Sequence, residues 1–144
     1  MQNFGKRNIM KLKDSIVLIT GGAGNIGSYI LDEVLKQEPK LCVIVDNFFN
    51  GKNINSSANV KYYPLDISKL DELSYVFETH KPDYVFHCAS MLIQDSEALP
   101  RKAINTNVMG TFNVVDLSNK FGIKKICYSS TKTLFTAGQR YQQN

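Results

Sequence analysis

Residues Ile16 to Gly27 read Ile-Val-Leu-Ile-Thr-Gly-Gly-Ala-Gly-Asn-Ile-Gly. An apolar run breaks into a glycine-rich turn, and apolar residues then recur at helical spacing. This pattern predicts a strand, a tight turn and a helix in direct succession. Such a frame suits a pyrophosphate, because the first N–H groups of the helix and the positive end of its dipole attract an anion.

The glycines of this turn have separate expected tasks. Gly21 permits the sharp turn, Gly24 lets the backbone approach phosphate oxygens, and Gly27 lets the helix pack closely on the strand. A second apolar run, Leu41 to Val45, ends at Asp46. A carboxylate at that strand end can accept both adenosine ribose hydroxyls and repels a 2′-phosphate, which favours NAD over NADP. A chance glycine turn with a surface aspartate would give the same pattern.

Composition narrows the function classes. The 144 residues are 43% hydrophobic and 21% charged, with a net charge of +4, and this suggests one globular domain. The lysines are scattered, so neither nucleic-acid binding nor membrane binding is expected. The three cysteines lack metal-ligand spacing and fall in expected core strands, which favours no metal and a cytoplasmic location. We expect a flexible extension over residues 1–13 and one domain over 14–144.

Hydrophobic periodicity predicts an alternation of strands and helices. Strands are expected at 16–20, 41–46, 60–63, 84–88 and 125–128. Helices are expected at 24–37, at 68–79 with Ser68 as N-cap, and at 100–121 with Gly122 ending it. The expected inward residues are Ile26, Ile30, Leu31, Val34 and Leu35 in the first helix, and Ile104, Val108, Phe112, Val115 and Leu117 in the last. The alternation predicts an α/β fold: a Rossmann-type doubly wound parallel sheet of order 3-2-1-4-5.

Further motifs follow in a fixed order along the chain. They are Asp66-Ile67, the run Pro82 to Ser90, the run Asn105 to Thr111, and Tyr128-Ser129-Ser130-Thr131. Together with the glycine turn, they closely resemble the extended short-chain dehydrogenase/reductases, the group of NAD-dependent nucleotide-sugar epimerases and dehydratases. The resemblance covers about residues 15–137.

The resemblance implies a role for each matching position. The pyrophosphate would lie on Gly21, Gly24, Asn25, Ile26 and Gly27. The adenosine ribose would contact Asp46 and Asn47, with Asn50 and Gly51 nearby. The adenine would contact Asp66 and Ile67, and the dinucleotide would run along Cys88, Ala89 and Ser90. Ser129, Ser130 and Thr131 would lie near the nicotinamide, and Thr131 matches the family's catalytic Ser/Thr.

Four residues also permit a purely structural interpretation. Asp66 could cap a turn before Ser68. Asn107 is a cofactor-site candidate, and we expect its side chain to brace the loop after the fourth strand rather than to contact substrate. Ser129 could satisfy only backbone groups at a strand end. For His87, we expect packing within a buried strand rather than a role in catalysis.

The sequence departs from the family at the acid/base. The family uses a helical Tyr-x-x-x-Lys pair, and its spacing places that tyrosine beyond Asn144. Tyr128 and Lys132 have the spacing, but Tyr128 falls in an expected strand. We therefore expect the NAD-binding portion of a nucleotide-sugar enzyme, without its C-terminal substrate lobe and inactive alone. A non-catalytic NAD-binding module, a sensor or regulatory subunit, is the second possibility.

Two further expectations follow from the same region. The dehydratases of this group usually carry Asp-Glu after the catalytic threonine, whereas Lys132-Thr133 follows Thr131 here. The resemblance therefore favours an epimerase, whose full-length form acts on a nucleotide sugar. With no sixth strand, the fifth strand would leave an open edge, and open edges promote pairing between chains. This predicts a homodimer.

Overall fold

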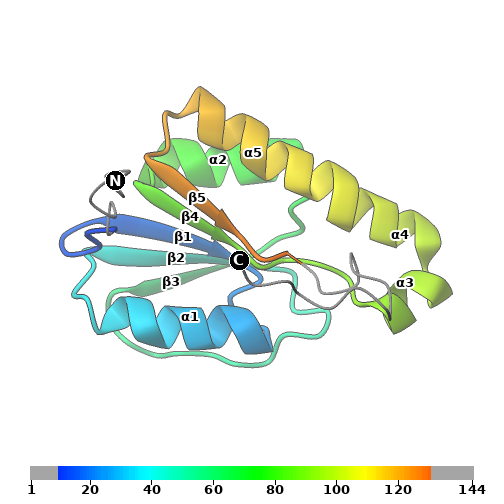
Figure 1. Cartoon of the computed structure of the whole chain (residues 1–144), viewed down its shortest axis with the longest axis horizontal. Helices are drawn as coiled ribbons and strands as arrows, with labels where there is room; N and C mark the ends of the chain where they lie inside the picture. The colour runs from blue at the N-terminus through cyan, green and yellow to red at the C-terminus, as the bar shows by residue number, and fades with distance from the viewer. Residues whose placement is uncertain (1–9, 131–144) are drawn as a thin grey trace, which may run out of the picture.

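The computed structural model describes residues 10–130, and Figure 1 shows the arrangement of its elements. The five strands are β1 (Ile16–Thr20), β2 (Leu41–Asp46), β3 (Val60–Pro64), β4 (Tyr84–His87) and β5 (Lys125–Tyr128). All neighbouring strands pair in parallel, in the order β3-β2-β1-β4-β5. The predicted fold class and strand order are confirmed.

The register of the central strands aligns their carboxyl ends. Thr20, the last residue of β1, lies opposite Val45 of β2 and opposite His87 of β4. Consequently the glycine turn after β1, Asp46 at the end of β2, and the segment after β4 leave the sheet at one edge. In open parallel sheets this edge is where ligands bind.

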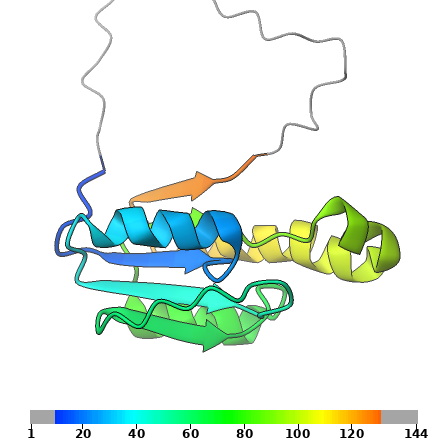
Figure 2. The same ribbon diagram turned by 90° about the horizontal axis from the view of Figure 1, so that it is seen from below.

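The sheet forms the middle of three layers (Figures 1 and 2). Helix α1 (Asn25–Leu35) covers one face, and α2 (Leu70–His80) and α5 (Thr111–Lys120) cover the other. Three short elements lead into α5: α3 (Ile93–Ala98), α4 (Pro100–Ile104) and η1 (Asn105–Gly110), a π-helix. The rod formed by α4, η1 and α5 extends past the carboxyl edge of the sheet.

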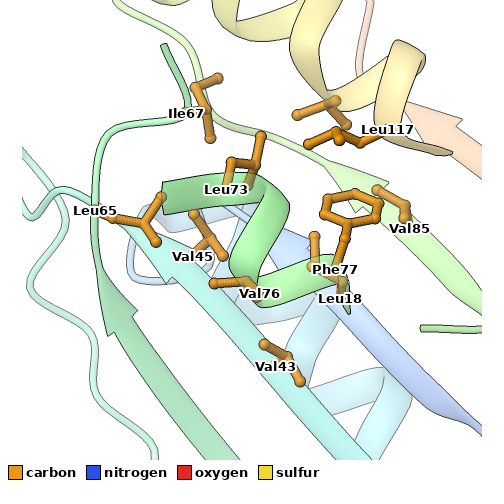
Figure 3. Packing of buried hydrophobic residues seen from close by; sticks show 11 residues of the cluster. Leu18, Val43, Val45, Leu65, Ile67, Leu73, Val76, Phe77, Val85 and Leu117 are labelled. Atoms are coloured by element: carbon orange, nitrogen blue, oxygen red, sulfur yellow. The ribbon is translucent and has the colours of Figure 1, made fainter. Parts of the chain in front are cut away.

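A separate apolar core lies on each side of the sheet. The core between the sheet and α2 and α5 contains Leu73, Val76 and Phe77 of α2, all fully buried (Figure 3). The core under α1 contains Leu31 and Val34, with Phe86 from β4. Because β1 and β2 are covered on both faces, they read as continuous apolar runs instead of alternating ones.

The prediction for residues 100–121 is wrong in two respects. The segment contains a π-helix in place of a continuous α-helix, and four of the five expected inward residues are exposed: Ile104, Val108, Phe112 and Val115. Only Leu117 is buried. Two contacts select the other face, because Gly110 lies against Ile67 and the Asn113 side chain donates to the Ile67 carbonyl at 3.0 Å.

Three smaller predictions also differ. Ile26 is exposed in the first turn of α1, next to the glycine turn, and is not part of the core under that helix. Helix α2 begins after Lys69, and the N–H of Ser68 is instead held by the Asp66 carboxylate. Cys127 is not in the core but exposed, because it lies in β5, at the edge of the sheet. All three cysteines are free thiols.

No helix within residues 10–130 is long and apolar enough to cross a membrane. Within the same residues, β5 pairs only with β4, so its other edge is open. Self-association through this edge stays a prediction.

The buried face of α2 gives a test of the core. Replacing Phe77, which is fully buried, with alanine should lower the free energy of unfolding by about 3–5 kcal/mol, because a large cavity remains. Tyr75→Ala on the exposed face of the same helix should change it by less than about 0.5 kcal/mol. Urea denaturation measures both, and equal losses would contradict the assigned faces.

Candidate functional site

A cavity of about 110 Å³ lies at the carboxyl edge of β1, β2 and β4. Its lining comes from the glycine turn, the loop after β2, the end of β3, the segment after β4, and η1. The lining residues are Gly21, Gly24, Val45, Asp46, Asn47, Phe49, Asn50, Gly51, Leu65, Ile67, Cys88, Ala89, Ser90, Met91 and Thr106. Ligand pockets usually measure about 300–1,000 Å³, so this cavity encloses only part of a large ligand.

In the glycine turn, backbone segments pack closely against one another. Gly21 has φ of +70°, and a Cβ there would stand 2.6 Å from the backbone nitrogen of Ala89. A Cβ on Gly27 would collide with the Gly21 carbonyl oxygen and stand 2.7 Å from the Cα of Gly22. Gly24 is less crowded, since a Cβ there would have a single neighbour within 4 Å, the Gly21 carbonyl oxygen at 3.3 Å. The turn therefore needs glycine at Gly21 and Gly27 for its own fold, whereas at Gly24 a Cβ would make one close contact.

Asp46 connects the glycine turn to the loop after β2. Its carboxylate accepts the N–H of Ala23 at 2.9 Å and the N–H of Phe48 at 2.8 Å. The residue is 8% exposed. The same loop returns to the turn at Gly51, which packs on Ala23, and the N–H groups of the next two residues donate to the Ala23 carbonyl. Each Asp46 oxygen retains a lone pair for a further hydrogen bond.

Two contacts join this loop to the helices beyond β4. The Asn50 side chain donates to Asp95 at 2.7 Å. The Lys102 ammonium lies 3.7 Å from the centre of the Phe49 ring, a cation–π contact. The loop after β2 is thereby held against α3 and α4.

Asp66 lies beside the cavity, between the lining residues Leu65 and Ile67. One of its oxygens accepts the Ser68 N–H at 2.9 Å, and the other lies 3.4 Å from the Asn47 amide. Partial burial would raise its pKa, but these hydrogen bonds and the charge of Lys102 outweigh it and lower the pKa. The turn-capping interpretation of Asp66 is thus correct, and one carboxylate oxygen still faces Asn47.

Asn107 and Ser129 hold backbone groups, as their structural interpretations predict. The Asn107 side chain accepts the N–H of Met91 at 2.7 Å and donates to its carbonyl at 3.1 Å, which braces the segment after β4. Ser129 donates to the His87 carbonyl through its N–H and its hydroxyl. Neither residue lines the cavity.

His87, the last residue of β4, is a buried histidine that is 1% exposed. Its two ring nitrogens lie 2.6 Å from the Thr20 hydroxyl and 2.9 Å from the Thr111 hydroxyl, and its ring stacks on Tyr128. Burial lowers its pKa to about 4, so the imidazole is neutral near pH 7. It is held within the core, and it joins the end of β1 to the start of α5.

The structure brings ten of the predicted site residues together around one cavity: Gly21, Gly24, Asp46, Asn47, Asn50, Gly51, Ile67, Cys88, Ala89 and Ser90. Asn25, Ile26 and Gly27 form the first turn of α1, next to this cavity. Thr131 lies outside the described residues. Among residues 10–130, no group of three or more His, Cys, Asp or Glu side chains could hold a metal ion.

Five lining residues are not among the predicted ones. Val45, Leu65 and Met91 directly flank predicted positions, so their place at the strand ends could have indicated them. Phe49 lies in a loop whose course the sequence does not fix. Thr106 belongs to the segment for which periodicity predicts the wrong inward face, and its hydroxyl gives no signal in the sequence.

Comparison with known proteins gives a consistent result. Residues 17–144 match the model of the NAD dependent epimerase/dehydratase family. The UDP-glucose 4-epimerase of Dictyostelium discoideum is 32% identical over 130 residues, which is 85% of this chain and 38% of that protein.

Solved epimerase structures are similar to this chain as well. An epimerase of Methanothermobacter thermautotrophicus superposes with a TM-score of 0.84 at 28% identity, over 92% of this chain and 40% of that one. A Thermus thermophilus UDP-glucose 4-epimerase in complex with NAD gives a TM-score of 0.70 at 27% identity, over 77% and 36%. The chain spans less than half the length of these three relatives.

The burial of His87 predicts a pH dependence of stability. Its pKa is about 4 when folded and about 6.5 when unfolded, so the unfolded state binds the additional proton between these values. Above pH 6.5 this residue therefore does not reduce the free energy of unfolding. As the pH drops from 6.5 to 4, its contribution should lower the free energy of unfolding by about 2–3 kcal/mol. Denaturation across this range should show a clearly smaller decline for His87→Gln.

His80→Gln is the matched control, because His80 is less buried, lies at the end of α2 and does not line the cavity. It should keep most of the decline. An unchanged decline in His87→Gln would show that His87 is not the source.

Proposed function

Because this chain belongs to the NAD-dependent epimerase/dehydratase family of extended short-chain dehydrogenase/reductases, we propose that it binds NAD at the carboxyl edge of β1, β2 and β4. It resembles the N-terminal part of the nucleotide-sugar epimerases. The observation that carries the proposal is the uncapped start of α1 at Gly24, where a Cβ would have a single neighbour within 4 Å. When bound, NAD supplies a hydride acceptor for a sugar carbon.

The first turn of α1 fits a pyrophosphate. The helix has Gly24 as its N-cap, and no side chain caps its first N–H groups. These groups and the helix dipole attract negative charge. The absence of a side chain at Gly24 lets phosphate oxygens approach the backbone, whereas any other residue would place a side chain there. Gly21, Asn25, Ile26 and Gly27 complete this part of the proposed site.

The loop after β2 fits the adenosine ribose. Asp46 is fixed by two backbone N–H groups and can accept the ribose hydroxyls with its remaining lone pairs. Asn47, Asn50 and Gly51 lie on the same loop. A 2′-phosphate would meet the Asp46 carboxylate at close range, and like charges repel.

We assign the adenine to the end of β3, where Ile67 lines the cavity and Asp66 is adjacent. Cys88, Ala89 and Ser90 would run along the dinucleotide towards Ser129 and Thr131. Asn107 supports this segment by bracing Met91. In this assignment the Thr131 hydroxyl would bond the reacting oxygen of a nucleotide sugar.

We propose that these 144 residues alone bind the cofactor without turning over a substrate. The one Tyr-x-x-x-Lys of the sequence begins at Tyr128, which lies in β5 with its ring stacked on His87. It is therefore not on a helix, where the acid/base of the family is expected. A non-catalytic NAD-binding module is the second candidate, and the strand position of Tyr128 favours it. The three free thiols favour a location in the cytoplasm.

Calorimetric titration tests the cofactor preference. The chain should bind NAD⁺ more tightly than NADP⁺, because the Asp46 carboxylate accepts ribose hydroxyls and repels a 2′-phosphate. Asp46→Ala should weaken NAD⁺ binding by about 1–3 kcal/mol, the scale of a hydrogen bond to a charged group, and should reduce the preference. Tighter binding of NADP⁺ by the unsubstituted chain would contradict the assignment of Asp46.

A turnover assay tests the second part. The 144-residue chain, supplied with NAD⁺ and UDP-glucose, should form no UDP-galactose or NADH above background. General acid–base catalysis contributes about 10²–10⁴ in rate, and residues 10–130 hold no tyrosine–lysine pair on a helix that could supply it. Turnover that disappears in Thr131→Val would show that the chain is a complete catalyst, with another residue as its base.

A further inference from the structure

We propose that residues 47–53, the loop after β2, are a lid over the cavity, and that contacts of this lid with Asp95 and Lys102 form a latch. The latch sets how fast a dinucleotide enters and leaves. This inference rests on the proposed function, since it concerns the same site. It adds two residues that act from outside, because neither Asp95 of α3 nor Lys102 of α4 lines the cavity.

The cavity is too small for a dinucleotide while the loop stays in place. Its volume is about 110 Å³, whereas ligand pockets usually measure about 300–1,000 Å³. Four residues of the loop line it: Asn47, Phe49, Asn50 and Gly51. The rest of the lining comes from the strand ends, the glycine turn, the segment after β4 and η1. One of these walls must therefore move before the ligand can bind.

The wall formed by the segment after β4 is fixed to its neighbours. Gly21 packs against the backbone of Ala89. The Asn107 side chain accepts the N–H of Met91 at 2.7 Å and donates to its carbonyl at 3.1 Å. Moving this wall would break backbone packing and two hydrogen bonds at once.

The loop, in contrast, is anchored to the glycine turn only near its two ends. No helix or strand lies between β2 and β3, both within the described residues. At one end the Phe48 N–H donates to Asp46 at 2.8 Å. At the other end Gly51 packs on Ala23, and the N–H groups of the next two residues donate to the Ala23 carbonyl. Between these anchors, side chains of the loop reach α3 and α4.

Phe48 has the backbone conformation expected of a strained hinge. Its φ is +56°, a left-handed value that is unusual for a bulky residue. The closed loop retains this strain, so contacts beyond Phe48 must hold it. Hinges of lids are a few loop residues that absorb a change in φ and ψ. Rotation at Phe48 would relieve the strain and carry Phe49 away from the cavity.

Two contacts hold the lid closed. The Asn50 amide donates to the Asp95 carboxylate at 2.7 Å, and the Lys102 ammonium lies 3.7 Å from the centre of the Phe49 ring. Asn50 and Phe49 are both exposed, and hydrogen bonds and cation–π contacts at exposed sites are individually weak. The latch can therefore break without unfolding of the domain.

A latch affects rates in a way that a direct ligand contact does not. Loss of a contact with bound ligand raises koff and weakens affinity by the same factor. Loss of a latch favours the open lid in both the free and the bound chain, so kon and koff rise together and Kd changes little.

The double variant Asp95→Ala/Lys102→Met tests the latch by stopped-flow measurement of NADH fluorescence. Its kon and koff should both rise about three- to tenfold, the scale of one or two weak contacts, with Kd within about twofold of the unsubstituted chain. Amide hydrogen exchange of residues 47–53 should rise severalfold in the ligand-free variant, while exchange in β2 stays the same.

Glu97→Ala/Arg101→Met is the matched control. It removes the same two charges from exposed positions on α3 and α4. It should leave both rates unchanged, and Asp95→Ala with Lys102→Arg should lie between the two double variants, because arginine keeps the cation over Phe49.

Three results would overturn the latch: unchanged rates in Asp95→Ala/Lys102→Met, a higher koff with an equal loss of affinity, or unchanged exchange of residues 47–53. Absence of NADH binding by the unsubstituted chain would instead overturn the proposed function and the dinucleotide as occupant. Exchange in the ligand-free chain would then still decide whether Asp95 and Lys102 hold the loop.

Discussion

The close approach of Gly27 to the Gly21 carbonyl is the constraint on which the site depends. It brings α1 directly onto the end of β1, so the helix begins within the turn instead of after a longer loop. The positive φ of Gly21 and its contact with Ala89 place the segment after β4 beside that turn. Two missing side chains thus bring a helix N-terminus and two strand ends to one point.

Asp46 extends this arrangement to the next strand. Its hydrogen bonds to Ala23 and Phe48 fix the loop after β2 against the glycine turn. The carboxylate therefore has a structural task in addition to the proposed one, and its position is set before any ligand binds. A preorganised acceptor of this kind loses little entropy when it bonds a ribose. The Asn50–Asp95 and Phe49–Lys102 contacts then join the same loop to α3 and α4.

The sheet could be predicted well from the sequence and the last helix poorly, for physical reasons. Strands β1 and β2 are buried on both faces, so their apolar runs and turn residues leave few other arrangements. The rod from α4 to α5 packs instead through Gly110, Asn113 and Thr106, which hydrophobic periodicity cannot weigh. Apolar residues of that rod, such as Phe112, are exposed. The strand-end residues of the site were predictable, whereas the π-helix η1 was not, because it depends on tertiary contacts.

The central claim is that the glycine turn is the cofactor site, and Gly24→Val tests it most directly. A Cβ at Gly24 would have one neighbour within 4 Å, the Gly21 carbonyl oxygen at 3.3 Å, which must shift by a few tenths of an ångström, so the variant should still fold, with a lower melting temperature than the unsubstituted chain. The valine would occupy the space where phosphate approaches the backbone, and calorimetric titration should detect no NAD⁺ binding. A folded Gly24→Val that binds NAD⁺ with unchanged affinity would contradict the account.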